Sequence, residues 1–335
     1  MTIQPIGRAE AFADAAPAAA ARPVPLLSVI APVKDEEVAI APFLARVRGV
    51  LDAVCAGEPW EILFVDDGST DQTAAHVAAA HLQDRRIRLL SLSRNFGKEA
   101  ALSAGIDHAR GRAVIPLDVD LQDPPEVIAE MVAQWRAGHD IVYGVRRDRQ
   151  TDHPLKRITA SLFYRSHNAL SRDKIPEHAG DFRLIDRKVA DVLRALPERN
   201  RFMKGLFAWG GFRQVAVEYD RAERAHGRSK FNYWKLWTLA LDGITSSSTV
   251  PLRIWSYVGS AVALASLVYA GLLVVDTLVN GTAVAGYPSL MTAMLFLGGV
   301  QLISLGVLGE YVGRILIEAK GRPIYIVRDS LGLEE

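Results

Sequence analysis

Cysteine is almost absent from this 335-residue sequence, which contains only Cys55. One cysteine excludes an internal disulfide and a metal site built from several thiolates. Its neighbours Val50, Leu51 and Val54 favour a buried small hydrophobe over a reactive thiol. Excess charge is absent as well, since 39 Lys and Arg residues nearly balance 38 Asp and Glu residues. A formal net charge of +1 gives no reason to expect nucleic acid as a partner.

Glycine loops that bind phosphate are also missing. Neither G-x-G-x-x-G nor G-x-x-x-x-G-K-[ST] occurs in the chain, which argues against dinucleotide-dependent hydride transfer and P-loop hydrolysis. Any phosphate must therefore be held by a metal and by side chains. Residues 1–25 are rich in alanine and proline and lack the continuous apolar segment of a signal peptide. We expect a disordered tail there and a large polar portion that stays in the cytoplasm.

Apolar residues, in contrast, make up 50% of the chain and form two long uncharged runs. Residues 255–275 and 288–309 each have the length of about 20 residues that crosses a hydrocarbon layer. They predict two transmembrane helices, with a pair of buried core helices as the alternative. Basic residues flank the two runs and are absent between them: Arg253, Arg314, Lys320 and Arg322. The positive-inside rule then predicts a multi-pass protein of the inner (cytoplasmic) membrane, with the polar domain and both termini in the cytoplasm.

Strand-like and helix-like segments alternate in the first half of the chain. The predicted strands are short runs rich in β-branched residues, at 26–33, 60–67, 87–93, 113–120 and 140–146. Helical patterns separate them, at 40–56, 73–82, 99–109 and 125–137. This alternation predicts an α/β fold with a mainly parallel, doubly wound sheet and helices on both of its faces.

The second half continues with a predicted helix at 153–171 and a short strand followed by a helix at 181–196. Aromatic and basic residues, among them Lys230 and Trp234, gather before the first apolar run and predict an interfacial helix. The organisation that we expect has five parts: a tail at 1–25, an α/β domain at 26–228, a juxtamembrane amphipathic segment at 229–253, two membrane helices within 254–311, and a cytoplasmic tail at 312–335.

Polar residues follow three of the predicted strands, in PVKDEE, DDGSTD and DVDLQD. Ligands of open α/β sheets bind beyond the carboxyl ends of the strands, so these segments predict one crevice. Asp118 and Asp120 suit a hard cation such as Mg²⁺ or Mn²⁺, and a solvated acidic loop is the alternative. Asp66 and Asp67 can accept hydrogen bonds from a base or ribose, while Ser69 to Asp71 can cap the next helix. Asp123 is expected to cap the helix that the following proline pair begins.

Basic side chains that suit phosphate are spread along the chain, although most surface arginines are merely solvated. The candidates are Lys98, Arg146, Arg147, Arg157, Arg201, Arg221, Arg224, Arg228 and Lys230. Arg224 and Lys230 are favoured because they lie close to the predicted membrane segment.

Seven motifs, in order, carry a resemblance to a known family: SVIAPVKDEE, FVDDGSTDQT, SRNFGKEAALSAG, DVDLQDPPE, GDFRLIDRKV, RAHGRSKF and GEYVGRI. The chain resembles the polyprenyl-phosphate glycosyltransferases of glycosyltransferase family 2, which include bactoprenol glucosyltransferases and dolichol-phosphate mannose synthase. The resemblance runs from about Leu27 to Arg328. It implies a GT-A fold that binds a nucleotide sugar and transfers the sugar, with inversion, to the phosphate of a membrane polyprenol.

The resemblance also implies roles for individual residues. Four residues would line the nucleoside pocket: Pro32, Lys34, Glu36 and Asp67. Lys34 and Asp35 depart from the common P-x-Y/F-N-E form of that motif. Asp118 and Asp120 would hold a divalent ion, Mg²⁺ or Mn²⁺, with Gln122 nearby and Val119 among the donor-binding residues. Arg146 and Arg157 would steady phosphates, and Arg224 and Lys230 would do so from the membrane side. Asp181 would orient the acceptor or act as a base, or else have a structural role.

The function expected from the resemblance is transfer of one sugar, with UDP-glucose as donor and undecaprenyl phosphate as acceptor, for modification of cell-envelope glycans such as lipopolysaccharide or O-antigen. Two membrane helices are too few for a polysaccharide channel, and the Q-x-x-R-W motif of processive members is absent. Alternative donors are UDP-N-acetylhexosamine, UDP-aminoarabinose and GDP-mannose. A non-catalytic membrane-anchored binding protein is the alternative from another class. Expected partners are the membrane, a downstream flippase and glycan-transfer enzymes, with a second copy of the chain as a further candidate.

Overall fold

The computed structural model describes residues 23–147, 179–199, 201, 203–220 and 286–333, together with isolated positions between 259 and 279. Within these residues the strands are β1 (Leu27–Val33), β2 (Trp60–Asp66), β3 (Ile87–Leu92), β4 (Ala113–Pro116), β5 (Ile141–Arg146), β6 (Ala179–Asp186), β7 (Gln214–Tyr219) and β8 (Val327–Leu331). The helices are α1 (Glu37–Cys55), α2 (Thr73–Gln83), α3 (Lys98–His108), α4 (Val127–Arg136), α6 (Arg187–Ala195), α7 (Met203–Trp209) and α10 (Tyr287–Lys320).

The described strands form one sheet in the order β7-β5-β6-β4-β1-β2-β3-β8. β1 pairs in parallel with both β2 and β4, and β2 pairs in parallel with β3. β5 and β7 also run parallel to each other, whereas β6 and β8 run antiparallel to their neighbours. The prediction of a mainly parallel sheet is therefore confirmed, and the carboxyl ends of β1, β2 and β4 meet at one edge.

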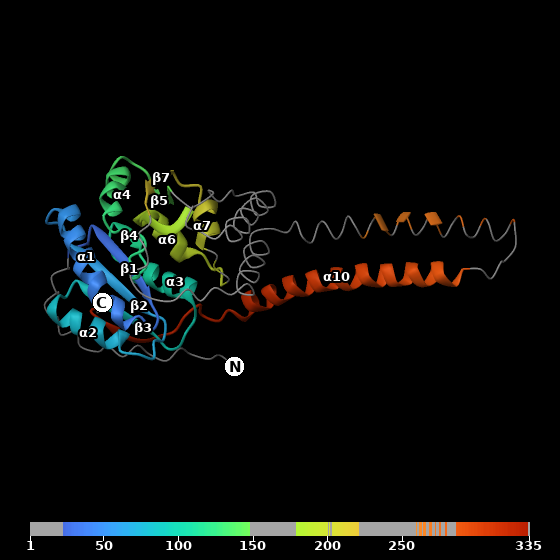
Figure 1. Cartoon of the computed structure of the whole chain (residues 1–335), viewed down its shortest axis with the longest axis horizontal. Helices are drawn as coiled ribbons and strands as arrows, with labels where there is room; N and C mark the ends of the chain where they lie inside the picture. The colour runs from blue at the N-terminus through green and yellow to red at the C-terminus, as the bar shows by residue number, and fades with distance from the viewer. Residues whose placement is uncertain are drawn as a thin grey trace, which may run out of the picture.

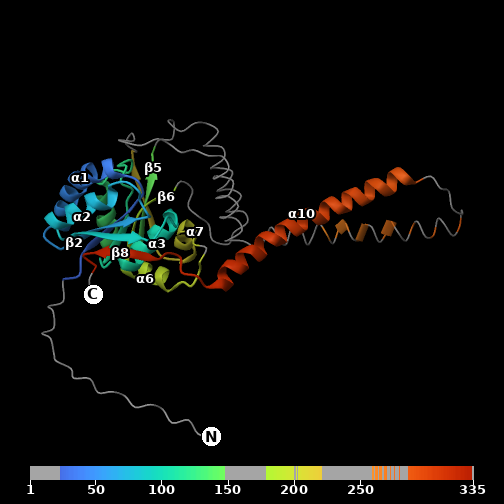
Figure 2. The same ribbon diagram turned by 90° about the horizontal axis from the view of Figure 1, so that it is seen from below.

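Helices cover both faces of the sheet, as Figures 1 and 2 show. The apolar residues of α1, α2 and α4 pack into the cluster on one face, where the rings of Phe43 and Phe64 meet edge to face at 5.7 Å. The apolar residues of α3, α6 and α7 pack into the cluster on the other face. β2 is buried along its whole length because it lies between these two layers. Such a strand needs the nearly continuous apolar run WEILFV that the sequence provides.

Most of the predicted elements are present, with ends displaced by a few residues. The five strands predicted before residue 147 all occur, and 181–196 contains the end of β6 followed by α6, as expected. α1 begins at Glu37 rather than at residue 40, and α4 begins at Val127 rather than at 125. The helix predicted at 153–171 and the amphipathic segment at 229–253 lie outside the described residues.

The C-terminal segment contains a strand that the sequence analysis missed. β8 lies within residues 312–335, which were predicted to be a tail, and it pairs antiparallel with β3. Ser93 N donates to Ile326 O at 2.8 Å, and Tyr325 Oη donates to Asp107 Oδ2 at 2.9 Å. The segment after α10 is therefore part of the sheet domain, because it covers the exposed edge of β3.

α10 extends away from the sheet domain in both views (Figures 1 and 2). Its 34 residues contain the predicted run 288–309 and continue to Lys320. The stretch Phe296–Lys320, of 25 residues, is long enough and on average apolar enough to cross a membrane, and none of its apolar part is buried. Among the described residues this is the one helix that meets that test. The other predicted membrane run, 255–275, lies mostly outside the described residues.

The crossing of α3 over β1 depends on a residue without a side chain. A Cβ added at Gly105 in α3 would clash with the side chain of Ile30, which is fully buried in β1. We predict that Gly105→Ala lowers the free energy of unfolding by about 1–3 kcal/mol through overpacking. Gly49→Ala, at an exposed position in α1 with open space around it, should instead raise the free energy by about 0.5–1 kcal/mol. Denaturation of the two purified variants measures both changes, and equal shifts would contradict the prediction.

Candidate functional site

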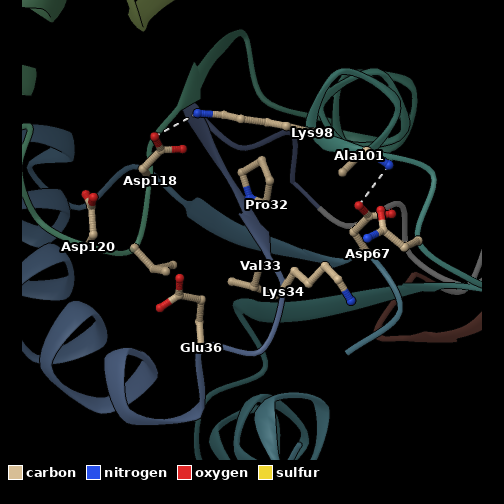
Figure 3. Close-up of a pocket in the computed structure, with 12 residues that line it drawn as sticks. Pro32, Val33, Lys34, Glu36, Asp67, Lys98, Ala101, Asp118 and Asp120 are labelled. Carbon is tan, nitrogen blue, oxygen red and sulfur yellow. Dashed lines mark hydrogen bonds and ion pairs between the residues drawn. The ribbon is translucent and has the colours of Figure 1, made fainter. Parts of the chain in front are cut away.

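A pocket of about 430 Å³ opens where β1, β2 and β4 end. Figure 3 shows residues from β1 and the loop after it, from the loops after β2 and β4, and from the first turns of α3 around this space. The lining residues are Pro32, Val33, Lys34, Glu36, Asp67, Asn95, Gly97, Lys98, Ala101, Asp118, Val119 and Asp120. Eight of them are residues that the sequence analysis selected as site candidates: Pro32, Lys34, Glu36, Asp67, Lys98, Asp118, Val119 and Asp120. The single crevice expected from the strand ends is therefore present.

The loop after β1 is locked to the loop after β2. Lys34 Nζ donates to Gly68 O at 3.1 Å, which directs this ammonium at the neighbouring loop. Asp35 accepts hydrogen bonds from Thr70 N at 2.7 Å and from Thr70 Oγ1 at 3.1 Å. The backbone hydrogen bond from Thr70 is the main cause that lowers the pKa of Asp35, so this carboxylate stays charged. Lys34 and Asp35, which depart from the common form of the first motif, thus join two walls of the pocket.

Asp66 and Asp67, at the end of β2, both accept hydrogen bonds from backbone N–H groups, but in two different loops. Asp66 is buried and accepts a hydrogen bond from Ser69 N at 2.9 Å. Asp67 lines the pocket, but its carboxylate accepts from Phe96 N at 2.6 Å and from Gly97 N at 2.9 Å. Asp67 therefore holds the chain just before α3, in addition to any contact that it makes with a ligand.

The turn that follows also prepares the start of α2. Asp71 Oδ1 accepts from Thr73 N at 3.0 Å and from Thr73 Oγ1 at 2.5 Å, and its Oδ2 accepts from Glu37 N at 3.2 Å. One carboxylate thus satisfies backbone donors at the starts of both α1 and α2. The N-cap of α2 is Gln72, which makes no side-chain cap hydrogen bond, so the predicted capping role is limited to Asp71, which accepts from the first backbone N–H of the helix from one position earlier.

Lys98 brings together two acidic residues from different parts of the sheet. Its Nζ lies 2.7 Å from Asp118 Oδ2 and 3.3 Å from Asp181 Oδ2. Asp118 follows β4, whereas Asp181 lies in β6. Partial loss of water around its half-exposed side chain opposes the charge on Lys98, but the two carboxylates outweigh it and hold the pKa of Lys98 above its ordinary value. The positive charge beside Asp118 is therefore the ammonium of Lys98.

Asp118 and Asp120 both line the pocket and form the acidic part of its wall (Figure 3). Asp120 Oδ1 accepts a hydrogen bond from Gln122 N at 3.1 Å, so the turn is held by its own backbone. Gln122 was predicted near the ion and does not line the pocket. Among the described residues no group of three or more His, Cys, Asp or Glu side chains could hold a metal. Two carboxylates fit a hard cation that takes its remaining oxygens from water and substrate.

Asp123 does not cap the helix after the proline pair, so that prediction is wrong. α4 begins later, at Val127, and has no side-chain cap. Asp123 is instead buried and accepts a hydrogen bond from Tyr219 Oη at the end of β7. Arg146, at the end of β5, lies 4.0 Å from the same carboxylate. Asp123 and Tyr219 therefore bind the end of the acidic loop to β7, and Arg146 contacts this pair and lies outside the pocket lining.

The remaining predicted residues are distributed between described and undescribed parts of the chain. Arg157, Arg221, Arg224, Arg228 and Lys230 lie outside the described residues. Arg147 pairs with Glu218 at 3.3 Å, and buried Arg201 donates to Leu196 O and Glu198 O, so neither lines the pocket. Val33, Asn95, Gly97 and Ala101 also line the pocket and were not selected from sequence, although the turn NFGK before a helix could have indicated Asn95 and Gly97.

Comparison with known proteins identifies the family. The family described as Glycosyl transferase family 2 matches residues 28–194, and the family described as GtrB C-terminal hairpin matches residues 250–315. The SfII prophage-derived bactoprenol glucosyl transferase of Shigella flexneri is 54% identical over 306 residues, which are 91% of this chain and 98% of that protein. The chain belongs to glycosyltransferase family 2. It is a transferase, and the resemblance stated from its motifs is confirmed.

A further relative in sequence agrees with this assignment. An uncharacterised glycosyltransferase of Synechocystis is 53% identical over 92% of this chain and 96% of its own length. Among solved structures, a mannosyltransferase from Pyrobaculum calidifontis in complex with GDP-Man and Mn²⁺ is 18% identical, with a TM-score of 0.43 over 84% of this chain and 87% of its own. At that level the likeness carries no argument about ligands.

The buried contact between Tyr219 and Asp123 predicts a pH dependence of stability. Burial, followed by the nearby charge of Asp123, raises the pKa of Tyr219 from 10.0 to about 12. The folded state then holds the phenol proton more tightly than the unfolded state, so the contribution to stability is complete below pH 10 and is lost between pH 10 and 12. Tyr219→Phe should lack this loss and should be less stable at neutral pH by about 1–3 kcal/mol, because Asp123 loses its donor. Denaturation of both proteins from pH 7 to 12 tests this, and parallel pH curves would contradict it.

Proposed function

We propose that this transferase moves glucose from UDP-glucose to the phosphate of a polyprenol, with inversion at the anomeric carbon. The observation that carries the proposal is the near full-length similarity to a protein named bactoprenol glucosyl transferase. The match of residues 250–315 to a hairpin family and the long apolar helix α10 agree with a lipid acceptor. The product is a polyprenyl-phosphate-linked sugar for modification of cell-envelope glycans.

The pocket suits the donor. A nucleoside diphosphate combines a flat base, a ribose and two charged phosphates, and the pocket offers different chemistry along its wall. Asp67, after β2, lies on the side that we assign to the nucleoside, and Glu36, after β1, offers a further hydrogen-bond acceptor near Asp120 (Figure 3). Lys98 provides a cation at the other side, beside Asp118 and Asp120. We assign that side to the diphosphate because charge of both signs is needed there.

A divalent cation completes the donor site in this proposal. Asp118 and Asp120 are the residues that would hold it, since their carboxylates face the same pocket and are the oxygen donors that Mg²⁺ and Mn²⁺ prefer. When bound, such an ion neutralises charge that develops on the departing nucleotide. Gln122 contributes through its backbone N–H, which fixes Asp120, rather than through a place in the pocket wall.

The acceptor requires little activation. A phosphomonoester has a second pKa of about 6, so near neutral pH it is mostly a dianion and already a nucleophile. The chain then has to position the acceptor and stabilise the leaving group. Asp181 contacts Lys98 at the edge of the diphosphate side, and we assign it to orient the acceptor phosphate. Arg146, Arg157, Arg224 and Lys230 remain proposed phosphate contacts.

The cellular setting follows from the same chemistry. A polyprenyl phosphate resides in a membrane, whereas UDP-glucose is made in the cytoplasm, so the sheet domain and both termini are proposed to face the cytoplasm of a multi-pass inner-membrane protein. Products of this kind need a flippase and a glycan-transfer enzyme as downstream partners. A homo-oligomer is compatible with the small residues Gly299, Gly306 and Gly313 on α10, which have open space around them.

A donor screen tests the proposed function. Purified full-length protein is incubated with undecaprenyl phosphate, Mg²⁺ or Mn²⁺ and one nucleotide sugar at a time, and the lipid extract is analysed by mass spectrometry. We expect UDP-glucose to give a glycolipid heavier by one hexose, with release of UDP. A glycolipid formed only from UDP-N-acetylhexosamine, UDP-aminoarabinose or GDP-mannose would change the donor that we assign but not the type of reaction. No glycolipid from any donor would favour a binding protein without catalysis.

Asp120→Asn tests the acidic wall of the pocket. The substitution keeps the size of the side chain and removes its charge, so we expect kcat to fall by at least about a hundredfold. Asp191→Asn is the matched control, because Asp191 is an exposed carboxylate on α6 that pairs with Arg187 and Arg194. The control should keep wild-type transfer, since such surface pairs contribute little. Equal rates for the two variants would exclude a role for Asp120 in transfer.

A further inference from the structure

The ammonium of Lys98 lies between the carboxylates of Asp118 and Asp181, for which we propose different roles. Figure 3 shows its side chain reaching from the start of α3 toward Asp118, which is 2.7 Å away. The same ammonium lies 3.3 Å from Asp181. Asp118 belongs to the proposed cation site, and Asp181 is proposed to face the acceptor. One lysine therefore connects the donor side of the site to the acceptor side.

A cation held by Asp118 must compete with this ammonium. Oxygen ligands lie about 2.0–2.6 Å from Mg²⁺, Mn²⁺ or similar hard cations, so an ion and Lys98 on the same carboxylate would be only a few ångström apart. Two positive charges at that separation repel each other, and the repulsion is stronger in a pocket than in open water. Lys98 and the ion therefore compete for Asp118, because the presence of either positive charge weakens the contact of the other.

The backbone of Lys98 is fixed, but its side chain can move. Asp67 accepts hydrogen bonds from Phe96 N and Gly97 N, which hold the chain immediately before Lys98. Gly97 has a φ of 98°, a conformation that favours glycine and sets the direction in which α3 starts. The Lys98 side chain is 47% exposed and ends a flexible four-carbon stem. Its ammonium can leave Asp118 while α3 stays in place.

We propose that Lys98 is a positioning residue that serves as a built-in counterion for Asp118 and Asp181 and that yields Asp118 when the cation and the nucleotide sugar bind. This inference rests on the proposed function. After the exchange, the donor phosphates are the anionic partner within reach of Lys98. Its withdrawal also changes the charge beside Asp181, so that binding of the donor prepares the acceptor side.

Binding of Mn²⁺ to the full-length protein, measured without nucleotide by the electron paramagnetic resonance signal of free Mn²⁺, tests this exchange. Lys98→Met removes the competing ammonium, and we expect Mn²⁺ to bind about fivefold more tightly. Lys98→Arg keeps a competing cation and should bind Mn²⁺ no more tightly than the wild type. Lys34→Met is the matched control, because Lys34 lines the same pocket but contacts Gly68 O and Asp35. Its loss removes the same charge without freeing Asp118, and Mn²⁺ affinity should change less than for Lys98→Met.

Kinetics separate this role from simple support of the fold. Lys98→Met should lower kcat at saturating UDP-glucose while it tightens Mn²⁺ binding. If Lys98 only supported the fold, the same substitution would lower kcat and weaken Mn²⁺ binding. Unchanged or weaker Mn²⁺ binding in a Lys98→Met protein with a wild-type melting temperature would overturn the proposal. Mn²⁺ binding by Lys98→Arg that is as tight as binding by Lys98→Met would also overturn the proposal. If Lys98→Met does not fold, Lys98→Gln replaces it. Failure of the proposed function has a different signature, since the wild-type protein would then bind Mn²⁺ but form no glycolipid.

Discussion

One buried carboxylate, that of Asp67, sets the geometry on which the site depends. It is 5% exposed and accepts hydrogen bonds from two successive backbone N–H groups, those of Phe96 and Gly97. Hydrogen bonds to an ionised acceptor are stronger than those between neutral groups, and burial makes their loss costly. The end of β2 is thereby joined to the start of α3, and Lys98 follows directly. The hydrogen bonds of Asp67, at the end of β2, thus fix the backbone position from which Lys98 reaches Asp118.

Much of the polar chemistry at the strand ends supports the pocket wall rather than a ligand. Asp35 and Asp71 fix the loops after β1 and β2, and Asp123 fixes the end of the acidic loop against Tyr219. These groups are satisfied within the chain, which gives the wall a defined shape. Asp118 and Asp120 differ because their carboxylates face the pocket. The acidic residues at the strand ends therefore separate into those that fix the loops and those whose carboxylates face the pocket.

The sequence predicted the pocket because its signals are local. Polar residues that directly follow β1, β2 and β4 must meet at one edge when those strands run in parallel, and this rule needs no knowledge of side-chain partners. The partners themselves are distant in sequence: Lys98 meets Asp181 from 83 positions away, and Asp123 meets Tyr219 from 96 positions away. Asp123 directly precedes a proline pair, which is the local pattern of a helix N-cap. The sequence therefore predicted a cap and not the contact with Tyr219. β8 was missed because VRDSL has no apolar alternation and forms a strand by covering β3.

The short segment between α10 and β8 keeps the end of α10 close to the end of the sheet where the pocket opens. α10 ends at Lys320, Gly321 follows in a left-handed conformation with φ of 59°, and β8 begins at Val327. The six residues 321–326 can span at most about 21 Å, so the end of α10 stays close to the sheet. Val327 pairs with Leu92, at the carboxyl end of β3, which is also the edge where β1, β2 and β4 open the pocket. Glu318 adds a second contact by accepting from Arg199 N. Because the chain enters the sheet at that edge, a phosphate carried by a lipid beside α10 would arrive on the side of the domain where the donor binds.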